Sequence, residues 1–473
     1  MSEKDGIDSL VLRWSSEARM SEKDGIDSLA LDWSWYAYKN IIDSLMLEWD
    51  EDNNIVDLQI ENDILDKLRP HSNLKVLRIE GYRGKRFPDW LGNSSYHNIT
   101  KVSLDRCRNC RTLPSLGQLP SLKRLEISDF SSVETVGDEF YRSDESCLET
   151  PFPMLETLSF YNVPCWKEWR CSSDFNALPR LRELSIWECP MLRGDLPNQL
   201  PSLQSLQIQN CEQLTSSGVH GRGHYCRKLE FQMDGQHHSL QELFIWDSCD
   251  SVTSLLLDSF PKLVRVSIGG CKKMETVVVS RSLSCLRSLN IQNCGSLKSA
   301  STLWMLAPQL KDLILLGCPE IELSATGYPH SSLRFLSISY SEELVSSAAF
   351  MNSQFHGLSH LVIDGKDDKS ESVKCLPKEG WLPPSLESLE LNDIKSVETL
   401  ECKGLAHLTS LQQLSIDDCP KLENIEGEKL PASLIRLKIY DSPLLGKKCE
   451  MKDPQVWPKV SHIRKIQVDG TWI

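Results

Sequence analysis

The stretch Leu203–Cys211, which reads LQSLQIQNC, sets the architecture of the chain. It has leucine at its first and fourth positions, isoleucine at its sixth and cysteine at its ninth. The alternation from Leu206 to Ile208 has a period of two, which is typical of a short β-strand with one buried face. Cysteine is small and readily buried, so the ninth residue is predicted to turn inward where the strand ends.

The same nine-residue pattern recurs along the chain. Further copies begin at Leu263, Leu286, Leu310 and Leu411, with Val266 replacing the fourth-position leucine in the first and Leu315 replacing the sixth-position isoleucine in the third. Weaker copies place Tyr82 and Phe130 at the ninth position instead of cysteine. The spacing of successive copies is roughly in the low twenties, which matches the period and register of leucine-rich repeats.

The repeat predicts a fold of the α/β class, a leucine-rich-repeat solenoid. We expect a curved right-handed horseshoe of roughly fifteen repeats, with a parallel sheet on its concave face. Irregular loops and short helical turns should cover the convex face. A single repeat cannot bury its own apolar face, so stability should come from stacking. This repeat domain is assigned to residues 51–473, with insertions near 130–152 and 212–239.

Residues 1–50 are predicted to form a separate, duplicated segment. Met1–Leu10 recurs identically as Met20–Leu29, and a shorter copy follows at Ile42–Leu45. Each copy runs into a Leu-x-Trp sequence. We interpret these copies as duplicates of an early repeat strand.

Composition and charge limit the classes of partner. The formal charge of −14 argues against a nucleic-acid or anionic-membrane partner, because both attract basic surfaces. The N-terminus lacks the apolar core of a secretory signal, and no apolar run is long enough for a membrane span. Many of the 17 cysteines recur at the ninth repeat position, which indicates packing rather than disulfides. A reducing, cytoplasmic location is expected.

A longer ordered series of motifs points to one family. It comprises Leu68–Tyr82, Phe87–Leu91, Cys107–Cys110, Leu113–Pro120, Val136–Tyr141 and Trp166–Trp169. In this order the motifs resemble the leucine-rich-repeat region of plant intracellular disease resistance proteins of the coiled-coil, nucleotide-binding (NB-ARC) class. Beyond Trp169 the resemblance is to the generic repeat pattern alone.

The resemblance implies a role in plant defence by recognition. No phosphate-binding Gly-x-x-x-x-Gly-Lys-Ser/Thr motif is found, and Gly446–Lys448 lacks the loop that would cradle phosphates. The implied partner is a protein: a pathogen effector, a host protein or a nucleotide-binding receptor module. The alternative is a substrate receptor of a ubiquitin ligase, although the first 50 residues show no plausible F-box.

Catalytic and metal chemistry find little support in the sequence. Cys107 and Cys110 form half of a zinc motif, but no matching pair stands at suitable spacing. His220, His224 and Cys226 lie within the second insertion, where a solvated loop is the default interpretation. We therefore expect no enzyme activity, no cofactor and no metal.

Residues that alternate with the buried anchors should face the concave surface. Large exposed aromatic side chains there are typical of protein-binding hot spots, and neighbouring parallel strands lie ~4.8 Å apart, so successive rings should form a contiguous stripe. Acidic residues in the same register (Glu80, Asp105, Asp364 and Asp417) are expected to be a solvated face. The predicted partner-binding residues are Tyr161, Trp187, Phe244 and Trp246, with a second, more apolar patch of Ile314, Leu316 and Phe335.

Overall fold

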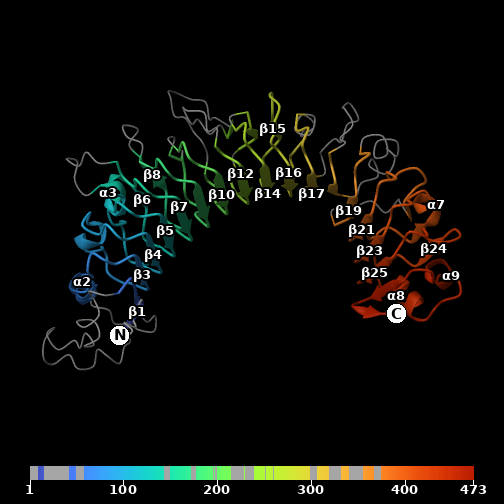
Figure 1. Ribbon diagram of the computed structural model, residues 1–473, viewed down its shortest axis with the longest axis horizontal. Helices are drawn as coiled ribbons and strands as arrows, with labels where there is room; N and C mark the ends of the chain where they lie inside the picture. The colour runs from blue at the N-terminus through green and yellow to red at the C-terminus, as the bar shows by residue number, and fades with distance from the viewer. Residues whose placement is uncertain are drawn as a thin grey trace, which may run out of the picture. The chain divides into compact units, whose positions relative to one another are not determined.

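The computed structural model describes most of the chain in two compact units, Met1–Val252 and Thr253–Ile473. Figure 1 labels most of the main strands and helices of both units. The described residues are 9–14, 42–49, 58–142, 150–171, 177–194, 196–197, 200–214, 228–229, 239–250, 252–258, 260–298, 306–318, 332–339, 355–366 and 374–473.

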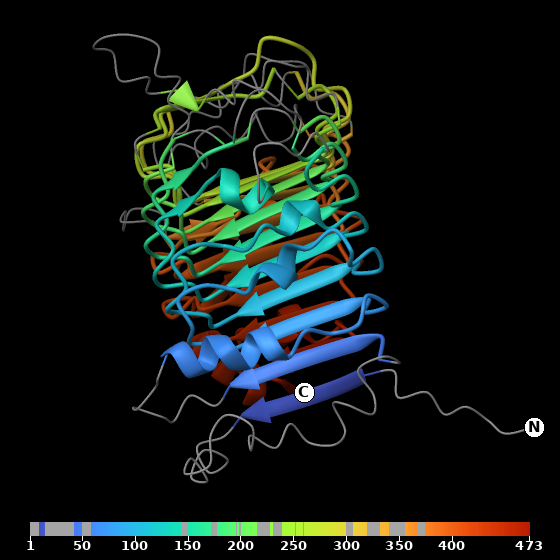
Figure 2. The same cartoon turned by 90° about the vertical axis from the view of Figure 1, so that its left-hand side faces the viewer.

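In the first unit, one parallel sheet runs through the successive repeats (Figure 2). Each strand pairs with the strand of the next repeat, and the register places leucine opposite leucine, as in Leu206 opposite Leu184 and Leu243. The strands are β1 (Ser9–Trp14), β2 (Ser44–Trp49), β3 (Val76–Glu80), β4 (Lys101–Asp105), β5 (Arg124–Ser128), β7 (Thr157–Tyr161), β9 (Glu183–Trp187), β10 (Ser205–Gln209) and β12 (Glu242–Trp246).

The second unit repeats this arrangement and ends in an antiparallel hairpin. Its strands are β14 (Arg265–Gly269), β16 (Ser288–Gln292), β17 (Asp312–Leu316), β18 (Phe335–Ser339), β19 (His360–Asp364), β21 (Ser388–Asn392), β23 (Gln413–Asp417), β25 (Arg436–Tyr440), β26 (Lys465–Val468) and β27 (Thr471–Trp472). The sheet and its register confirm the leucine-rich-repeat solenoid.

Short elements on the return segments complete the repeats. Small parallel pairs form between β6 and β8, β13 and β15, and β20, β22 and β24. The short strands are β6 (Thr135–Val136), β8 (Glu168–Trp169), β11 (Lys228–Leu229), β13 (Ser254–Leu256), β15 (Thr276–Val278), β20 (Cys375–Leu376), β22 (Thr399–Glu401) and β24 (Asn424–Glu426). The helices are α2 (Leu58–Lys67), η4 (Asp89–Gly92), η5 (Leu116–Gln118), α3 (Asp138–Tyr141), α7 (Cys402–Leu405), α8 (Pro443–Glu450) and α9 (Trp457–Val460).

The repeat anchors face inward as predicted. Leu203, Leu206, Ile208 and Cys211 are each at most 1% exposed. The bulky ninth residues of the weaker copies, Tyr82 and Phe130, are buried as well. Stacking therefore buries every apolar anchor of these repeats, which is the source of stability expected for a solenoid.

The ninth residue links neighbouring repeats through its polar atom. The Sγ atom of Cys211 donates to the carbonyl of Ile186 in the preceding repeat at 3.5 Å, and the backbone N–H of Cys211 donates to Ser248 Oγ in the next repeat at 3.0 Å. Ser442 accepts the N–H of Cys419 in the same way at 3.0 Å. Ser248 and Ser442 stand at the ninth position of their own repeats. Cysteine and serine at this position therefore both form hydrogen bonds with buried backbone groups at the strand end.

The residue after most of the described main strands adopts a left-handed conformation, and Gly365 after β19 is an exception. The N–H of the left-handed residue donates to the next repeat, as Asn162 N does to Trp187 O at 2.9 Å. Asparagine, aspartate and glycine tolerate this conformation best. They occupy it at Gly81, Asp129, Asn162, Asn210, Asp247, Gly270, Asn293, Gly317, Asp393, Asp418 and Asp441. Two residues depart from the rule: Arg106, with φ of 53°, and Glu188, with φ of 55°.

Most of the first predicted insertion lies within the described residues, but little of the second does. In the first, Phe140, Tyr141 and Phe152 are fully buried, so its described residues extend the core. Phe160, Trp166 and Trp169 continue this aromatic cluster, in which Phe160 and Trp166 have ring centroids 4.6 Å apart. Most of the second insertion, including His220, His224 and Cys226, lies outside the described residues.

Two of the three N-terminal copies form neighbouring strands. β1 and β2 pair in parallel with Leu10 opposite Leu45 and Trp14 opposite Trp49. The equivalent residues of the duplicated sequence therefore occupy equivalent places in the sheet. The middle copy, residues 20–33, lies outside the described residues.

Candidate protein-binding surface

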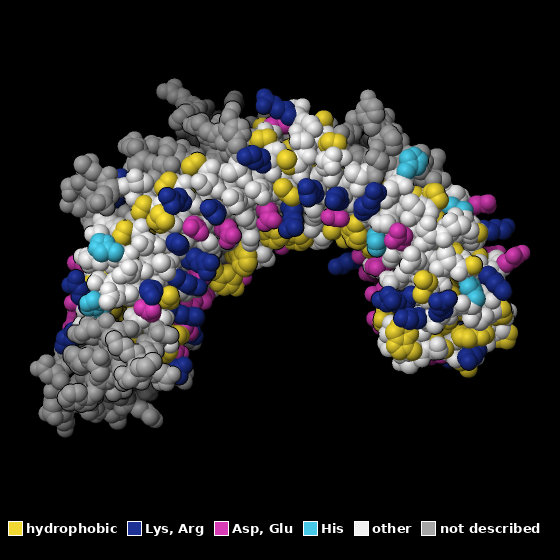
Figure 3. Space-filling model, in the orientation of Figure 1, with side chains coloured by type: hydrophobic (Ala, Val, Ile, Leu, Met, Phe, Trp, Pro, Cys, Tyr) yellow, Lys and Arg dark blue, Asp and Glu magenta, His cyan; other side chains and the backbone are white. Residues whose placement is uncertain are grey.

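The first, third and fifth residues of each main strand leave the core and form the exposed face of the sheet. In β9 the alternation is plain: Leu184 and Ile186 are buried, whereas Ser185 is half-buried and Trp187 is exposed. Because the register is constant, residues at one position form a row across the strands. Hydrophobic side chains gather along this face in each unit (Figure 3).

Tyr161 and Trp187 are the most exposed of the predicted binding residues. They lie opposite each other on β7 and β9, with 41% and 36% of their surface exposed. Their ring centroids are 6.4 Å apart and the rings meet edge to face at 73°. Two large rings that remain in solvent are suitable anchors for a protein partner.

Phe244 and Trp246 form a second aromatic pair on β12. Their rings stack at a centroid distance of 5.7 Å and an angle of 18°, and both are half-buried. Between Trp187 and Trp246, β10 contributes Gln209 to the row. The predicted contiguous stripe is therefore two aromatic pairs separated by one polar strand, because the aromatic character of the row is broken at Gln209.

The second predicted patch is more recessed. Ile314 and Leu316 on β17 are half-buried, as is Phe335 on β18. The register places Phe335 opposite Asp312, and Ile314 opposite Ser337. Phe335 thus lies toward the start of the strands, diagonal to Ile314.

Glu188 connects the first aromatic pair to a charge. Its Oε1 atom accepts the Tyr161 hydroxyl at 3.1 Å. This hydrogen bond, with the nearby charges of Glu188 and Asp129, raises the pKa of Tyr161 above its ordinary value. Tyr161 therefore remains a neutral donor held by a carboxylate.

Beside the aromatic pairs, strands β3 to β5 carry charges in place of rings. Glu80 is buried, forms an ion pair with Arg106 and lies 3.2 Å from Arg78. Asp105 accepts the Ser128 hydroxyl. The prediction that Glu80 belongs to a solvated face is wrong, because Arg106 from the left-handed position folds over it.

In the second unit, carboxylates collect after successive strands. Lys395 lies 2.6 Å from both Asp393 and Asp418. Burial, with the neighbouring charges of Asp441, Asp418 and Asp393, raises the pKa of Asp417. The carboxylates at the strand ends repel one another, and Lys395 compensates only part of their negative charge.

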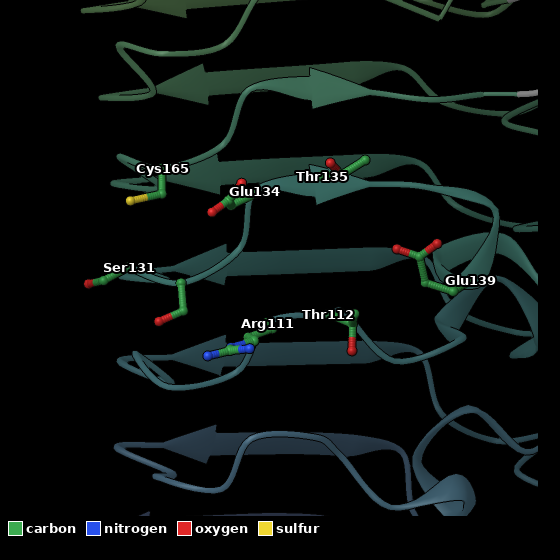
Figure 4. A pocket seen from close by; sticks show the side chains of 8 residues that line it. Arg111, Thr112, Ser131, Glu134, Thr135, Glu139 and Cys165 are labelled. Atoms are coloured by element: carbon green, nitrogen blue, oxygen red, sulfur yellow. The ribbon is translucent and has the colours of Figure 1, made fainter.

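A polar hollow of about 630 Å³ opens on the return segments of the first unit (Figure 4). Its lining includes Arg111, Glu134, Glu139 and Cys165. Lys167 pairs with Glu134 at 2.8 Å and lowers the pKa of that carboxyl. An ionised, paired carboxylate does not have the raised pKa expected of a general acid.

Cys107 and Cys110 are packing residues. Both are fully buried, and their thiols donate to the carbonyls of Asp105 and Gly84 at 3.4 Å and 3.1 Å. Burial raises the pKa of both thiols. Within the described ranges, no group of three His, Cys, Asp or Glu residues is arranged to hold a metal ion. The helices of those ranges also include none with the length and apolar character of a membrane span.

Comparisons with known families match the first unit. Residues 36–130 match the family of R13L1/DRL21 leucine-rich repeats. Residues 85–217 match the leucine-rich repeats described as plant disease resistance protein RPS2-like. The buried motif residues Trp90, Tyr141, Trp166 and Trp169 lie within these ranges, so the family signature is largely a signature of the core.

Curated relatives carry the same assignment. The chain is 38% identical over 253 residues to the putative disease resistance RPP13-like protein 1 of Arabidopsis thaliana, covering 51% of this chain and 22% of that protein. It is 33% identical over 165 residues to the putative disease resistance protein RGA1 of Solanum bulbocastanum, covering 35% of this chain and 15% of that protein. The chain thus spans about a fifth or less of these relatives.

Among solved structures, a leucine-rich-repeat protein of Leptospira interrogans is similar over 97% of this chain and 99% of its own, at 16% identity and a TM-score of 0.47. The register described above and the family matches together define a leucine-rich-repeat module. Residues 36–217 are therefore similar to the leucine-rich-repeat regions of plant disease resistance proteins. Repeat architecture and relatives indicate a non-enzymatic module that takes part in protein–protein interaction.

Proposed function

We propose that this chain is a protein-recognition module in plant immunity that binds a pathogen effector or a host protein through the exposed face of its sheet. Recognition would take place in the cytoplasm and would rest on shape and a few aromatic anchors, without covalent chemistry, nucleic acid, cofactor or metal. The relatives' role in disease resistance and the repeat architecture support this proposal.

The observation that carries the proposal is the exposure of Tyr161 and Trp187 on adjacent strands. Each of these two rings leaves about a third or more of its surface in water. The fold does not require an aromatic residue at this position, since Gln209 occupies it on β10. Burial of such rings against a partner commonly contributes about 2 kcal/mol or more per residue. Phe244 and Trp246 would extend the contact beyond β10.

The test uses the double variant Trp187→Ala with Trp246→Ala. Immobilised wild-type and variant chains are exposed to extract from infected plant leaves, and each protein retained by the wild type is purified and tested for direct binding. We expect the double variant to lose at least roughly a hundredfold in affinity, consistent with two anchors. Recovery of a ubiquitin-ligase adaptor as the direct partner would instead favour the substrate-receptor alternative.

Trp472→Ala provides the matched control, because Trp472 is 57% exposed but lies on β27 in the second unit. This variant should bind like the wild type. Circular dichroism and urea unfolding check that all variants keep the fold. Unchanged binding by the folded double variant would reject the aromatic face as the recognition surface.

A further inference from the structure

The aromatic pairs lie in a region of the sheet whose outward charges are all negative. This region, here called the aromatic face, comprises the outward residues of β7, β9, β10 and β12 and the residue that follows each strand. No lysine or arginine occupies any of these described positions. The ionisable side chains with a charge at neutral pH are Glu183, Glu188, Glu242 and Asp247.

The adjoining strands show that this pattern is not imposed by the repeat. Arg78, Lys101 and Arg124 occupy outward positions on β3, β4 and β5, where they accompany acidic residues. Lys101 pairs with Glu126 at 2.8 Å, for example. Charge is therefore balanced within that part of the face, whereas the aromatic face presents rings and carboxylates together.

Glu188 is held where its backbone is strained. Its φ of 55° lies in the left-handed region, and the equivalent positions of the first unit carry glycine, asparagine or aspartate, with Arg106 as the other exception. A glutamate there is less favourable than asparagine, and strain of this kind concentrates at functional sites. The strained residue places its carboxylate on the hydroxyl of Tyr161, beside Trp187.

Glu188 makes no ion pair within the described part of the chain, and its side-chain contact is the neutral Tyr161 hydroxyl. Aromatic rings attract cations through their faces, and arginine in particular stacks on rings while pairing with a carboxylate. A cation seated here would gain both interactions at once. The same surface would repel an acidic segment.

We infer that the aromatic face recognises a cationic segment of its protein partner, with an arginine or lysine side chain seated against Tyr161 and Trp187 and paired with Glu188. This inference rests on the proposed function and adds the chemistry of the partner to it. Glu188 then sets specificity for charge, while the rings supply most of the buried area.

The test measures binding of a fluorescently labelled peptide of alternating arginine and glycine by anisotropy. The comparison peptide replaces each arginine with citrulline, which keeps the shape and removes the charge. We expect the arginine peptide to bind the wild-type chain roughly tenfold more tightly than the citrulline peptide, and to weaken as salt rises. Equal binding of the two peptides, or no saturable binding of the arginine peptide at low salt, would overturn the inference.

Two variants of Glu188 separate charge from folding. Glu188→Gln removes the charge and keeps an oxygen that can accept from Tyr161, and Glu188→Asn supplies the residue type favoured by the left-handed backbone. Both should bind the arginine peptide roughly tenfold more weakly, and Glu188→Asn should be at least as stable as the wild type. Glu134→Gln, which removes a carboxylate from the polar hollow, should leave peptide binding unchanged.

The two proposals fail in different ways. If the tryptophan double variant loses the extract-derived partner but Glu188→Gln retains it at every salt concentration, the aromatic face binds without charge recognition and this inference falls. If the double variant also retains that partner, the proposed function itself falls.

Discussion

Strands β3 to β5 and strands β7, β9, β10 and β12 of the first unit have the same kind of buried face but differ on their outward face. Inward, both regions present buried apolar side chains in the same register, mostly leucine and isoleucine with Val102 on β4 and Phe160 on β7. Outward, the earlier strands carry paired charges such as Arg106 with Glu80, whereas the later strands carry aromatic rings and carboxylates. Stacking therefore constrains only the inward residues, so that neighbouring repeats can acquire unrelated surface chemistry.

The largest change in the free energy of unfolding is expected for a buried tryptophan, compared with an exposed one. Trp166→Ala should lower the free energy of unfolding by about 3–5 kcal/mol, because it opens a cavity in the aromatic cluster. Trp187→Ala should lower it by only about 1 kcal/mol, since the ring lies on the exposed face and loses mainly its edge contact with Tyr161. Urea unfolding monitored by circular dichroism measures both. A similar loss for the two variants would contradict the assignment of Trp187 to the exposed face.

The next comparison applies one substitution at equivalent left-handed positions. Arg106→Asn should destabilise the fold by about 2 kcal/mol, because Glu80 is buried and loses its main counter-charge. Glu188→Asn should cause no loss, since Glu188 supports no buried charge. Adding Glu80→Gln to Arg106→Asn should recover part of the stability. If Arg106→Asn were harmless, the charged region would not depend on this ion pair.

A smaller effect is expected at the link between repeats. Ser248→Ala should cost about 1 kcal/mol, because the buried N–H of Cys211 then lacks its acceptor. Ser248→Cys should retain most of the stability, since cysteine fills this position elsewhere. Hydrogen exchange at the Cys211 amide reports the change directly. Equal exchange rates in the wild type and Ser248→Ala would refute the proposed link.

The smallest effect concerns the acidic strand ends of the second unit. The pKa of Asp417 is raised in the folded protein, so its ionisation opposes folding once pH exceeds the ordinary aspartate value. Asp417→Asn should therefore stabilise the fold at neutral pH by less than about 0.5 kcal/mol, because the carboxyl is only partly desolvated and solvent screens the neighbouring charges. The gain should vanish below the ordinary aspartate pKa, where both states bind the proton. Unfolding curves at several pH values test this; a gain that persists in acid would contradict it.

Much of the fold followed from the sequence, because the inward anchors repeat with a fixed period. Leu206, Ile208 and Cys211 could be placed without coordinates, as could the exposure of Tyr161 and Trp187. The left-handed position was present in the sequence as a recurrent Asn, Asp or Gly before the ninth residue and could have been found there. The burial of Glu80 could not, because it depends on Arg106 from the left-handed position after the next strand.

The sequence by itself determined the repeat, its register and the inward face, since burial selects residue type at each anchor regardless of its neighbours. The tertiary structure alone decided which outward residues meet. Tyr161 meets Glu188 of the neighbouring repeat, because stacking brings together residues more than twenty positions apart. Such contacts depend on the length of each return segment, which the nine-residue pattern leaves free.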